Sequence, residues 1–187
     1  MVRDSDATRA RLLAAAVDEF AAYGIAGARV DRIAAAACAS KAQIYHYYGS
    51  KEALFEAVFS TLVADVARQI PIDVHDLPGY AADLAAGYDS HPEVARLVTW
   101  YRLEYADRRP PSPQVVDSLR DKVDAIERAQ AEGVLPTHYA AEAVLALILH
   151  LAALWTATSP EYAVATRPAS RQERRDIVVD AVRRLLN

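Results

Sequence analysis

The chain has 187 residues, of which 53% are hydrophobic and 25% are charged, and its formal net charge is −4 at pH 7. This is an ordinary globular composition, and the single cysteine, Cys38, excludes an intrachain disulfide and a cysteine-based metal cluster. The longest apolar run is short for a membrane span and the first residues do not have the pattern of a signal peptide. A cytoplasmic protein with no membrane partner is therefore expected.

The charge is unevenly distributed along the chain. Residues 1–52 contain seven Lys and Arg residues and six Asp and Glu residues, a balance of +1, which leaves −5 for the remainder. An acidic chain is a poor general binder of nucleic acid, but a mildly basic first segment can still bind DNA through one local face.

Hydrophobic residues recur with helical periodicity throughout, and no segment alternates convincingly with period two. Four helices are expected first, over residues 6–23, 30–36, 40–47 and from Ser50 to about residue 69. Gly24 is typical of the residue that follows a helix end, and Ser40 and Ser50 are typical N-caps.

Further helices are expected over residues 78–89, 92–108, 113–132, 137–157 and 170–186. Pro78, Pro92 and Pro113 lie where proline is tolerated in a first helical turn, and Ser170 with Glu173 has the spacing of a capping box. The sequence thus predicts an all-α protein of about nine helices.

Residues 30–47 have the pattern of a helix, a three-residue turn and a second helix. Only Ile44 and Tyr48 lie on the inward stripe of this second helix, so its other side chains point outward. Short side chains near the start of a helix, together with donors that reach base edges, are what a helix in the DNA major groove requires.

The outward residues each have a suitable partner on DNA. Lys41 suits a guanine, Gln43 an adenine and Ala42 a thymine methyl group, while Tyr45 offers its hydroxyl to a phosphate. A lysine at the start of a helix is unfavourable with the helix dipole, so Lys51 indicates a phosphate bound there.

The segment TRARLLAAAVDEFAAYGIAGARVDRIAAAACASKAQIYHYYGSKEALFEAVF, residues 8–59, resembles the DNA-binding domain of the TetR family of transcriptional regulators. The resemblance rests on features at fixed spacings, which are Ala16, Phe20, Gly24, Val30, Ile33-Ala34, Ser40-Lys41, Ile44-Tyr45, Tyr48, Ser50-Lys51 and Leu54. It implies that Tyr45 and Lys51 contact phosphates and that Lys41, Ala42, Gln43 and His46 face the bases. The candidate DNA-binding residues are Arg29, Ser40, Lys41, Ala42, Gln43, Tyr45, His46, Tyr47 and Lys51.

The sequence departs from the family pattern at three places. Cys38 stands where glycine is usual in the turn, so it has to accept a positive φ or reshape the turn, at a cost of about 1 kcal/mol. Ala28-Arg29 replaces the hydroxyl residues that cap the second helix, so the cap is weakened and Arg29 is expected to supply the phosphate contact. Tyr48 replaces phenylalanine and needs a polar neighbour for its hydroxyl. For Tyr47, packing inside the domain and contact with DNA remain equal alternatives.

Residues 91–113 are similar to C-terminal domains of actinobacterial members of the same family. This resemblance implies a helical dimer with one effector pocket per subunit, and a fourth helix that shifts when the effector binds. The candidate pocket residues are Phe59, Tyr88, Trp100, Tyr101, Glu104, His150 and Trp155, since rings with a few polar groups suit a small-molecule site. The alternative is that these aromatic residues at helical spacing form ordinary core.

The helix expected over residues 137–157 is apolar nearly all round, interrupted only by Glu142 and His150 between Ala140 and Trp155. One face can be buried in its own subunit, and the other then needs a partner. Together with the last helix it predicts a four-helix dimer interface. The candidate interface residues are Leu147, Leu151, Leu154, Val178, Val182 and Leu185.

These inferences predict a DNA-binding domain over residues 1–50 and a helical effector-binding and dimerisation domain over residues 51–187. The expected function is a homodimeric repressor that binds a pseudo-palindromic operator and is released by a small hydrophobic or aromatic effector, without a cofactor or metal. A ligand-independent DNA-binding protein is one alternative. An enzyme is another, although no catalytic motif such as a Cys-His pair or HExxH is present. The sequence does not identify the effector, the operator or the regulated genes.

Overall fold

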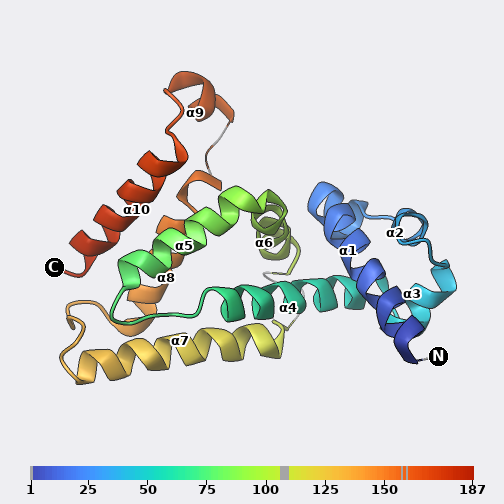
Figure 1. The fold of residues 1–187 in the computed structure, drawn as a ribbon, viewed down its shortest axis with the longest axis horizontal. Coiled ribbons are helices and arrows are strands. Elements are labelled where there is room, and N and C mark those ends of the chain that lie inside the picture. The colour runs from blue at the N-terminus through green and yellow to red at the C-terminus, as the bar shows by residue number, and fades with distance from the viewer. Residues whose placement is uncertain (1, 106–109, 157, 159) are drawn as a thin grey trace. The chain divides into compact units, whose positions relative to one another are not determined.

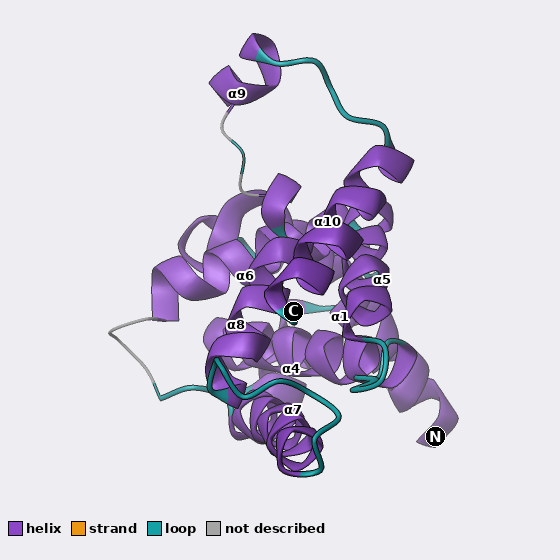
Figure 2. Cartoon of the chain, turned by 90° about the vertical axis from the view of Figure 1, so that its left-hand side faces the viewer, coloured by secondary structure: helices purple, strands orange, loops and turns teal. Residues whose placement is uncertain are grey.

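The computed structural model describes residues 2–105, 110–156, 158 and 160–187. All regular structure in these residues is helical, and Figure 2 shows helices joined by loops with no strand among them. This confirms the all-α fold class. None of the described helices is both long enough and apolar enough to cross a membrane.

The first four helices lie close to where the sequence predicts them (Figure 1). They are α1 (Val2–Gly27), α2 (Val30–Ala36), α3 (Lys41–Tyr48) and α4 (Lys51–Gln69). Gly24 interrupts α1 with a φ of 66°, so the main helix ends at the expected glycine and one further turn follows it. The Ala53 N–H donates to the Ser50 hydroxyl over 3.0 Å, which confirms Ser50 as a cap.

The later helices are α5 (Leu77–Ser90), α6 (Pro92–Tyr105), α7 (Pro113–Ala131), α8 (Ala141–Ala152), α9 (Pro160–Ala165) and α10 (Arg171–Leu185). The prolines lie in first turns as expected, and Ser170 forms the predicted capping box with Glu173. The expected extension of the sixth helix to residue 108 lies outside the described residues.

The prediction of one helix over residues 137–157 is wrong in its limits. α8 begins only at Ala141 because the Gln130 side chain donates to the carbonyls of Pro136 and Tyr139, over 2.7 and 2.8 Å, and holds these residues in a loop. After α8 the chain forms a 3-10 turn over Leu154–Thr156 and then α9, which the sequence analysis did not predict.

The chain forms two compact units. The first contains residues up to Asp65 together with Glu93–Val115, and the second contains Val66–Pro92 and Val116–Asn187. The first unit therefore includes most of α4 and α6, which is more of the chain than the expected DNA-binding segment 1–50.

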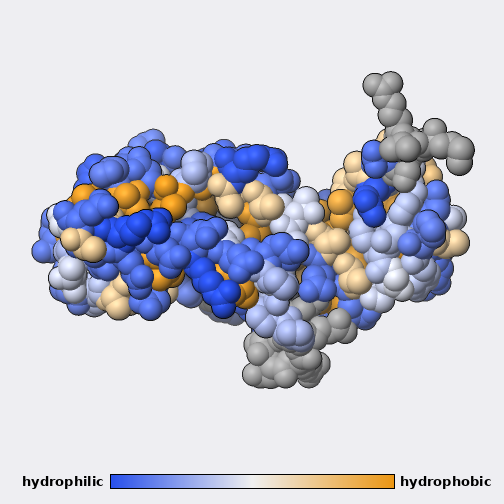
Figure 3. Space-filling view, turned by 90° about the horizontal axis from the view of Figure 1, so that it is seen from below, coloured by the Kyte–Doolittle hydropathy of each residue, from blue (hydrophilic) through white to orange (hydrophobic). Residues whose placement is uncertain are grey.

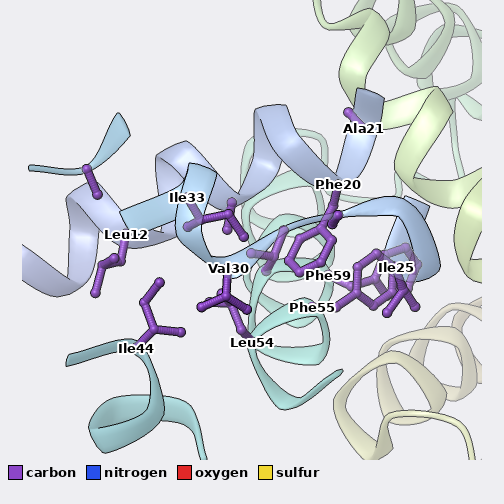
Figure 4. Close-up of a cluster of buried hydrophobic side chains, with 14 of the residues drawn as sticks. Leu12, Phe20, Ala21, Ile25, Val30, Ile33, Ile44, Leu54, Phe55 and Phe59 are labelled. Atoms are coloured by element: carbon purple, nitrogen blue, oxygen red, sulfur yellow. The ribbon is translucent and has the colours of Figure 1, made fainter. Parts of the chain in front are cut away.

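The core of the first unit is a cluster of buried apolar side chains (Figure 4). Leu12 and Phe20 of α1 meet Ile33 of α2, Ile44 of α3 and Phe55 of α4, and each of these side chains is fully buried. This confirms Ile44 as an inward residue of α3, and α1 and α2 likewise bury one face each, as helical periodicity requires.

The second unit has its own core, formed mainly where α5, α8 and α10 pack together. Tyr80, Ile148 and Val182 are buried in it, and Ile126 of α7 joins them. Single apolar side chains remain exposed between hydrophilic ones, as the face in Figure 3 shows.

Candidate nucleic-acid interface

The turn between α2 and α3 is fixed by its backbone. The N–H groups of Ala37, Cys38 and Ala39 donate to carbonyls within α2, over 3.0, 3.2 and 2.9 Å. Cys38 has a φ of 49°, so it occupies the left-handed conformation that the family pattern assigns to glycine. Of the two expected alternatives, a positive φ or a reshaped turn, the chain adopts the positive φ.

The start of α2 is capped by a side chain of α1 that lies 10 residues earlier in the sequence. Arg29 provides no side-chain cap, as predicted, but its N–H donates to Glu19 Oε1 of α1 over 2.8 Å. Glu19 is 8% exposed and also binds Arg32, with a shortest N–O distance of 2.6 Å. Burial raises the pKa of Glu19, but the hydrogen bonds from Arg32 and Arg29 outweigh this effect and leave it below its usual value. No local sequence pattern indicates this contact, because Glu19 and Arg29 are 10 residues apart.

Helix α3 carries the candidate base contacts and is called the reading helix below. It begins with a complete capping box. The Gln43 N–H donates to Ser40 Oγ over 3.2 Å, and the Ser40 N–H donates to Gln43 Oε1 over 2.8 Å. Gln43 Oε1 is therefore occupied in the DNA-free chain. A bidentate contact of Gln43 with adenine has to replace this hydrogen bond. The predicted adenine contact would therefore remove the Ser40 N–H to Gln43 Oε1 hydrogen bond of the capping box.

The outer face of α3 is open. Lys41, Ala42, Tyr45 and His46 are exposed, while Ile44 on the opposite face is fully buried. The structure thus brings four of the candidate DNA-binding residues together on one surface. Their contacts with DNA remain predictions.

Both lysines in the first turns of helices have partners within the chain. Lys41 Nζ lies 3.1 Å from Asp31 Oδ1 of α2. Lys51 Nζ donates to the carbonyls of Ala28 and Ala26, over 3.1 and 3.3 Å, at the end of α1. A carboxylate and helix-end carbonyls carry the negative charge that offsets an unfavourable cation at a helix start. A phosphate is thus not needed to explain Lys51, and its DNA contact stays a prediction.

Tyr47 and Tyr48 face inward to different extents. Tyr47 is half-buried against the first core, and the Arg9 guanidinium lies 5.5 Å from its ring centre. This arrangement supports packing for Tyr47, and its contact with DNA stays a prediction. Burial raises the pKa of Tyr48, with the nearby Arg9 charge opposing the shift. Arg11 links α1 to the turn between α2 and α3, because its Nε donates to the Ala37 carbonyl over 3.2 Å.

Three side chains of α6 hold the end of α1. The Trp100 indole and the Arg96 guanidinium donate to the Ala21 carbonyl, over 3.3 and 2.6 Å. One turn further along α6, Glu104 Oε1 accepts the N–H of Ile25 over 2.8 Å. This α6 clamp, defined as Arg96, Trp100 and Glu104, satisfies backbone groups on both sides of Gly24, where the helix is interrupted.

The candidate pocket residues are divided between the two units. In the first unit, Phe59 and Tyr101 stack with ring centres 4.0 Å apart, and Trp100 and Glu104 belong to the α6 clamp. These four side chains therefore pack or hydrogen-bond within the unit.

The other three candidates, Tyr88, His150 and Trp155, belong to the second unit. Tyr88 and Trp155 pack against the second core, and His150 is exposed with Nδ1 2.7 Å from the Ala146 carbonyl oxygen. A hollow of about 150 Å³ between α5 and α10, lined by Arg171, Arg174 and Asp89 among others, contains none of the predicted pocket residues. The pocket assignment stays a prediction.

The candidate interface residues also differ in burial. Leu147 and Leu154 are 39% and 43% exposed, whereas Val178 and Val182 are buried in the chain's own second core. On α10 it is Ile177, 48% exposed, that carries an outward apolar side chain. Among the described residues no group of three or more His, Cys, Asp or Glu side chains is placed to hold a metal ion.

Known proteins resemble this chain over nearly its full length. The family profile described as bacterial regulatory proteins, tetR family, matches residues 12–58, and the profile described as tetracyclin repressor-like, C-terminal domain, matches residues 76–184. The HTH-type transcriptional repressor SCO4008 of Streptomyces coelicolor is 37% identical over 99% of this chain and 98% of its own length.

Two further similarities extend this result. The HTH-type transcriptional repressor NicS of Pseudomonas putida is 30% identical, over 71% of this chain and 68% of its own. The crystal structure of SCO4942, a transcriptional regulator from Streptomyces coelicolor, matches with a TM-score of 0.84 and 39% identity, covering 95% of this chain and 97% of that chain.

Proposed function

The chain belongs to the TetR family of transcriptional regulators, and from this premise we propose that it is a homodimeric repressor that a small-molecule effector releases from a pseudo-palindromic operator. Membership of the family makes it a DNA-binding transcriptional regulator. The sign of regulation, the assembly and the effector are the proposed parts.

The exposed face of α3 is the observation that carries the proposal. Ile44 fixes the inner side of the helix and the Ser40 capping box fixes its start, so Lys41, Ala42, Tyr45 and His46 are presented on a rigid element. A short helix held in this way can enter the major groove as a preformed element. Repression is supported by the two relatives named as transcriptional repressors.

The exposed apolar residues of the second unit support the homodimer. Leu147 lies on α8, Leu154 begins the 3-10 turn after it, and Ile177 lies on α10, and all three side chains are exposed. Pairing these residues with their copies would remove apolar surface from water and present two reading helices to successive major grooves, about 34 Å apart.

The α6 clamp supports release by an effector. Its hydrogen bonds hold α1 on both sides of Gly24. α1 in turn contacts both ends of α2, through Glu19 at its start and Arg11 in the turn that follows it. An effector that binds one position of α6 better than another would therefore change the reading motif, by no more than its difference in affinity for the two positions.

The same geometry gives Glu104 a structural role. Its Oε1 accepts the Ile25 backbone N–H, so this oxygen is already engaged within the chain. A hydrophobic or aromatic effector remains the proposal.

The first test is DNA binding by a matched pair of tyrosine variants. Sites are selected from random DNA and then titrated with the wild type, Tyr45→Ala and Tyr139→Ala. Tyr45 and Tyr139 are both 45% exposed, but only Tyr45 lies on α3. Loss of a charge-assisted contact should lower operator affinity by about tenfold in Tyr45→Ala and leave Tyr139→Ala unchanged. Equal affinities for all three proteins would refute the assignment of α3.

The second test concerns release. Ligands are screened for loss of operator binding, and the half-effective concentration of a hit is compared between the wild type, Glu104→Gln and Trp100→Phe. Each substitution removes or weakens one hydrogen bond of the α6 clamp, so release should require a different effector concentration while binding without effector persists. Tyr139→Phe, at an exposed residue of the second unit outside the candidate pocket, is the control. Unchanged release in both clamp variants would place the coupling elsewhere.

A further inference from the structure

Asp31 is the one acidic residue of α2, and it lies beside the reading helix. Its Oδ1 and Oδ2 are 3.1 and 3.4 Å from Lys41 Nζ, so the ammonium lies between both carboxylate oxygens. Both side chains are solvent-exposed, 62% for Asp31 and 52% for Lys41. A carboxylate on a surface that approaches DNA is repelled by phosphates, so its presence there needs a reason.

The two helix ends explain why the pair forms. Asp31 is in the first turn of α2, where a negative charge is favourable, and Lys41 is in the first turn of α3, where a positive charge is unfavourable. The carboxylate therefore offsets the charge of Lys41 locally. Because the pair is exposed, it contributes little to folding stability and can be rearranged on binding.

Lysine has a flexible four-carbon stem and three N–H donors. Without a partner, the Lys41 ammonium would swing towards any nearby phosphate and strengthen binding to all DNA sequences alike. While it remains on Asp31, one donor is occupied and the head group is held over the start of α3. The other donors are then free to reach the O6 and N7 acceptors of a guanine.

We propose that Asp31 determines DNA specificity by holding Lys41 as a donor to a base edge and by withholding its charge from phosphates. This inference rests on the proposed function of α3 as the reading helix. Asp31 lies outside α3, and its acidic side chain would act by weakening the competing complex with non-operator DNA.

The test compares operator and non-operator DNA. Binding of the wild type and Asp31→Asn is titrated across salt concentrations, on a selected site and on a scrambled duplex of the same length. For Asp31→Asn we expect affinity for scrambled DNA to rise by about threefold to tenfold and its salt slope to steepen by about 1, because one more cation reaches a phosphate. Operator affinity should change less, so the ratio of operator to non-operator affinity should fall.

Two controls separate the pairing from charge alone. Asp18→Asn removes the same charge from an exposed position on α1 that has no contact with Lys41. In a Lys41→Ala background, the effect of Asp31→Asn should shrink to that of Asp18→Asn. Asp31→Ser provides a second variant if the asparagine variant does not fold.

The possible outcomes distinguish this inference from the proposed function. If the wild type does not prefer any selected site over scrambled DNA, the proposed function fails. If the wild type has an operator but Asp31→Asn behaves like Asp18→Asn, only the role of Asp31 fails. An effect of Asp31→Asn that persists without Lys41, or a loss confined to the operator, would also overturn the pairing, because Asp31 would then act by itself.

Discussion

The two units of this chain are stabilised in different ways. In the first, side chains distant in sequence satisfy the backbone at helix ends: Glu19 at the start of α2, Lys51 at the end of α1 and Glu104 beyond Gly24. In the second, α5, α8 and α10 share an apolar core, and the ion pairs Arg175–Asp83 at 3.1 Å and Arg174–Asp89 at 2.8 Å join α10 to α5 beside it. Single polar residues should therefore matter more in the first unit, and apolar volume should matter more in the second.

Two glycines with positive φ provide the largest test of this difference. Gly24 and Gly133 have φ values of 66° and 74°. A Cβ added to Gly24 would lie 2.7 Å from Glu104 Oε1, whereas a Cβ added to Gly133 would have no atom within 4 Å among the described residues. Gly24→Ala should lower the free energy of unfolding by about 3 kcal/mol, against about 1 kcal/mol for Gly133→Ala. Urea unfolding measures both, and equal losses would show that the α6 clamp does not crowd α1.

A second comparison separates the core of the second unit from its outer face. Val182 is fully buried and Leu147 is 39% exposed. Val182→Ala should lower the free energy of unfolding by about 2 kcal/mol without changing the assembly state. Leu147→Glu should instead convert the proposed dimer to monomers, visible by sedimentation, with little change in the stability of the monomer. A wild type that is monomeric at micromolar concentration would exclude the dimer.

A third test uses pH and the two acids that cap helices. The pKa of Glu19 lies below its usual value, and that of Glu173 is lowered to about 2, mainly by the Ser170 backbone N–H. A lowered folded-state pKa stabilises the fold above the unfolded pKa, near 4.3, and this contribution is lost as pH falls through the folded-state value.

Glu19 is buried beside Arg32, so Glu19→Gln should lower stability at pH 7 by about 1–2 kcal/mol and flatten its fall below pH 4.5. Glu173 is solvent-exposed and glutamine also suits a capping box, so Glu173→Gln should change little. Thermal unfolding between pH 3 and 7 compares them, and a larger effect at Glu173 would contradict the contrast between the units.

The smallest expected effect concerns Tyr48. Its hydroxyl is buried, and no hydrogen bond partner for it occurs in the described part of the chain. Tyr48→Phe should therefore be neutral or raise the free energy of unfolding by up to about 1 kcal/mol. A destabilisation of that size in denaturant would show that the hydroxyl has a partner, such as water or Arg9.

The sequence was sufficient for features that depend on near neighbours in the chain. The positions of α2 and α3, the N-cap at Ser40, the capping box at Ser170 and the inward stripe through Ile44 all follow from periodicity and local side-chain chemistry. The family resemblance added the exposed candidates on α3. α8 was predicted too long because the Gln130 side chain, which holds the preceding loop, lies outside the apolar run that was used to predict the helix.

Tertiary structure alone decided which partner each polar group meets. Glu19 and Arg29 are 10 residues apart, Lys51 and Ala28 are 23 apart, and Glu104 and Ile25 are 79 apart. No local pattern links such pairs, so Lys51 could be interpreted as a phosphate ligand and Glu104 as a pocket carboxylate. Val178 and Val182 were assigned to a partner for the same reason, since periodicity shows that a helix face is apolar but not what covers it. Helical period and capping are set within a few residues, whereas burial and pairing depend on which distant helices meet.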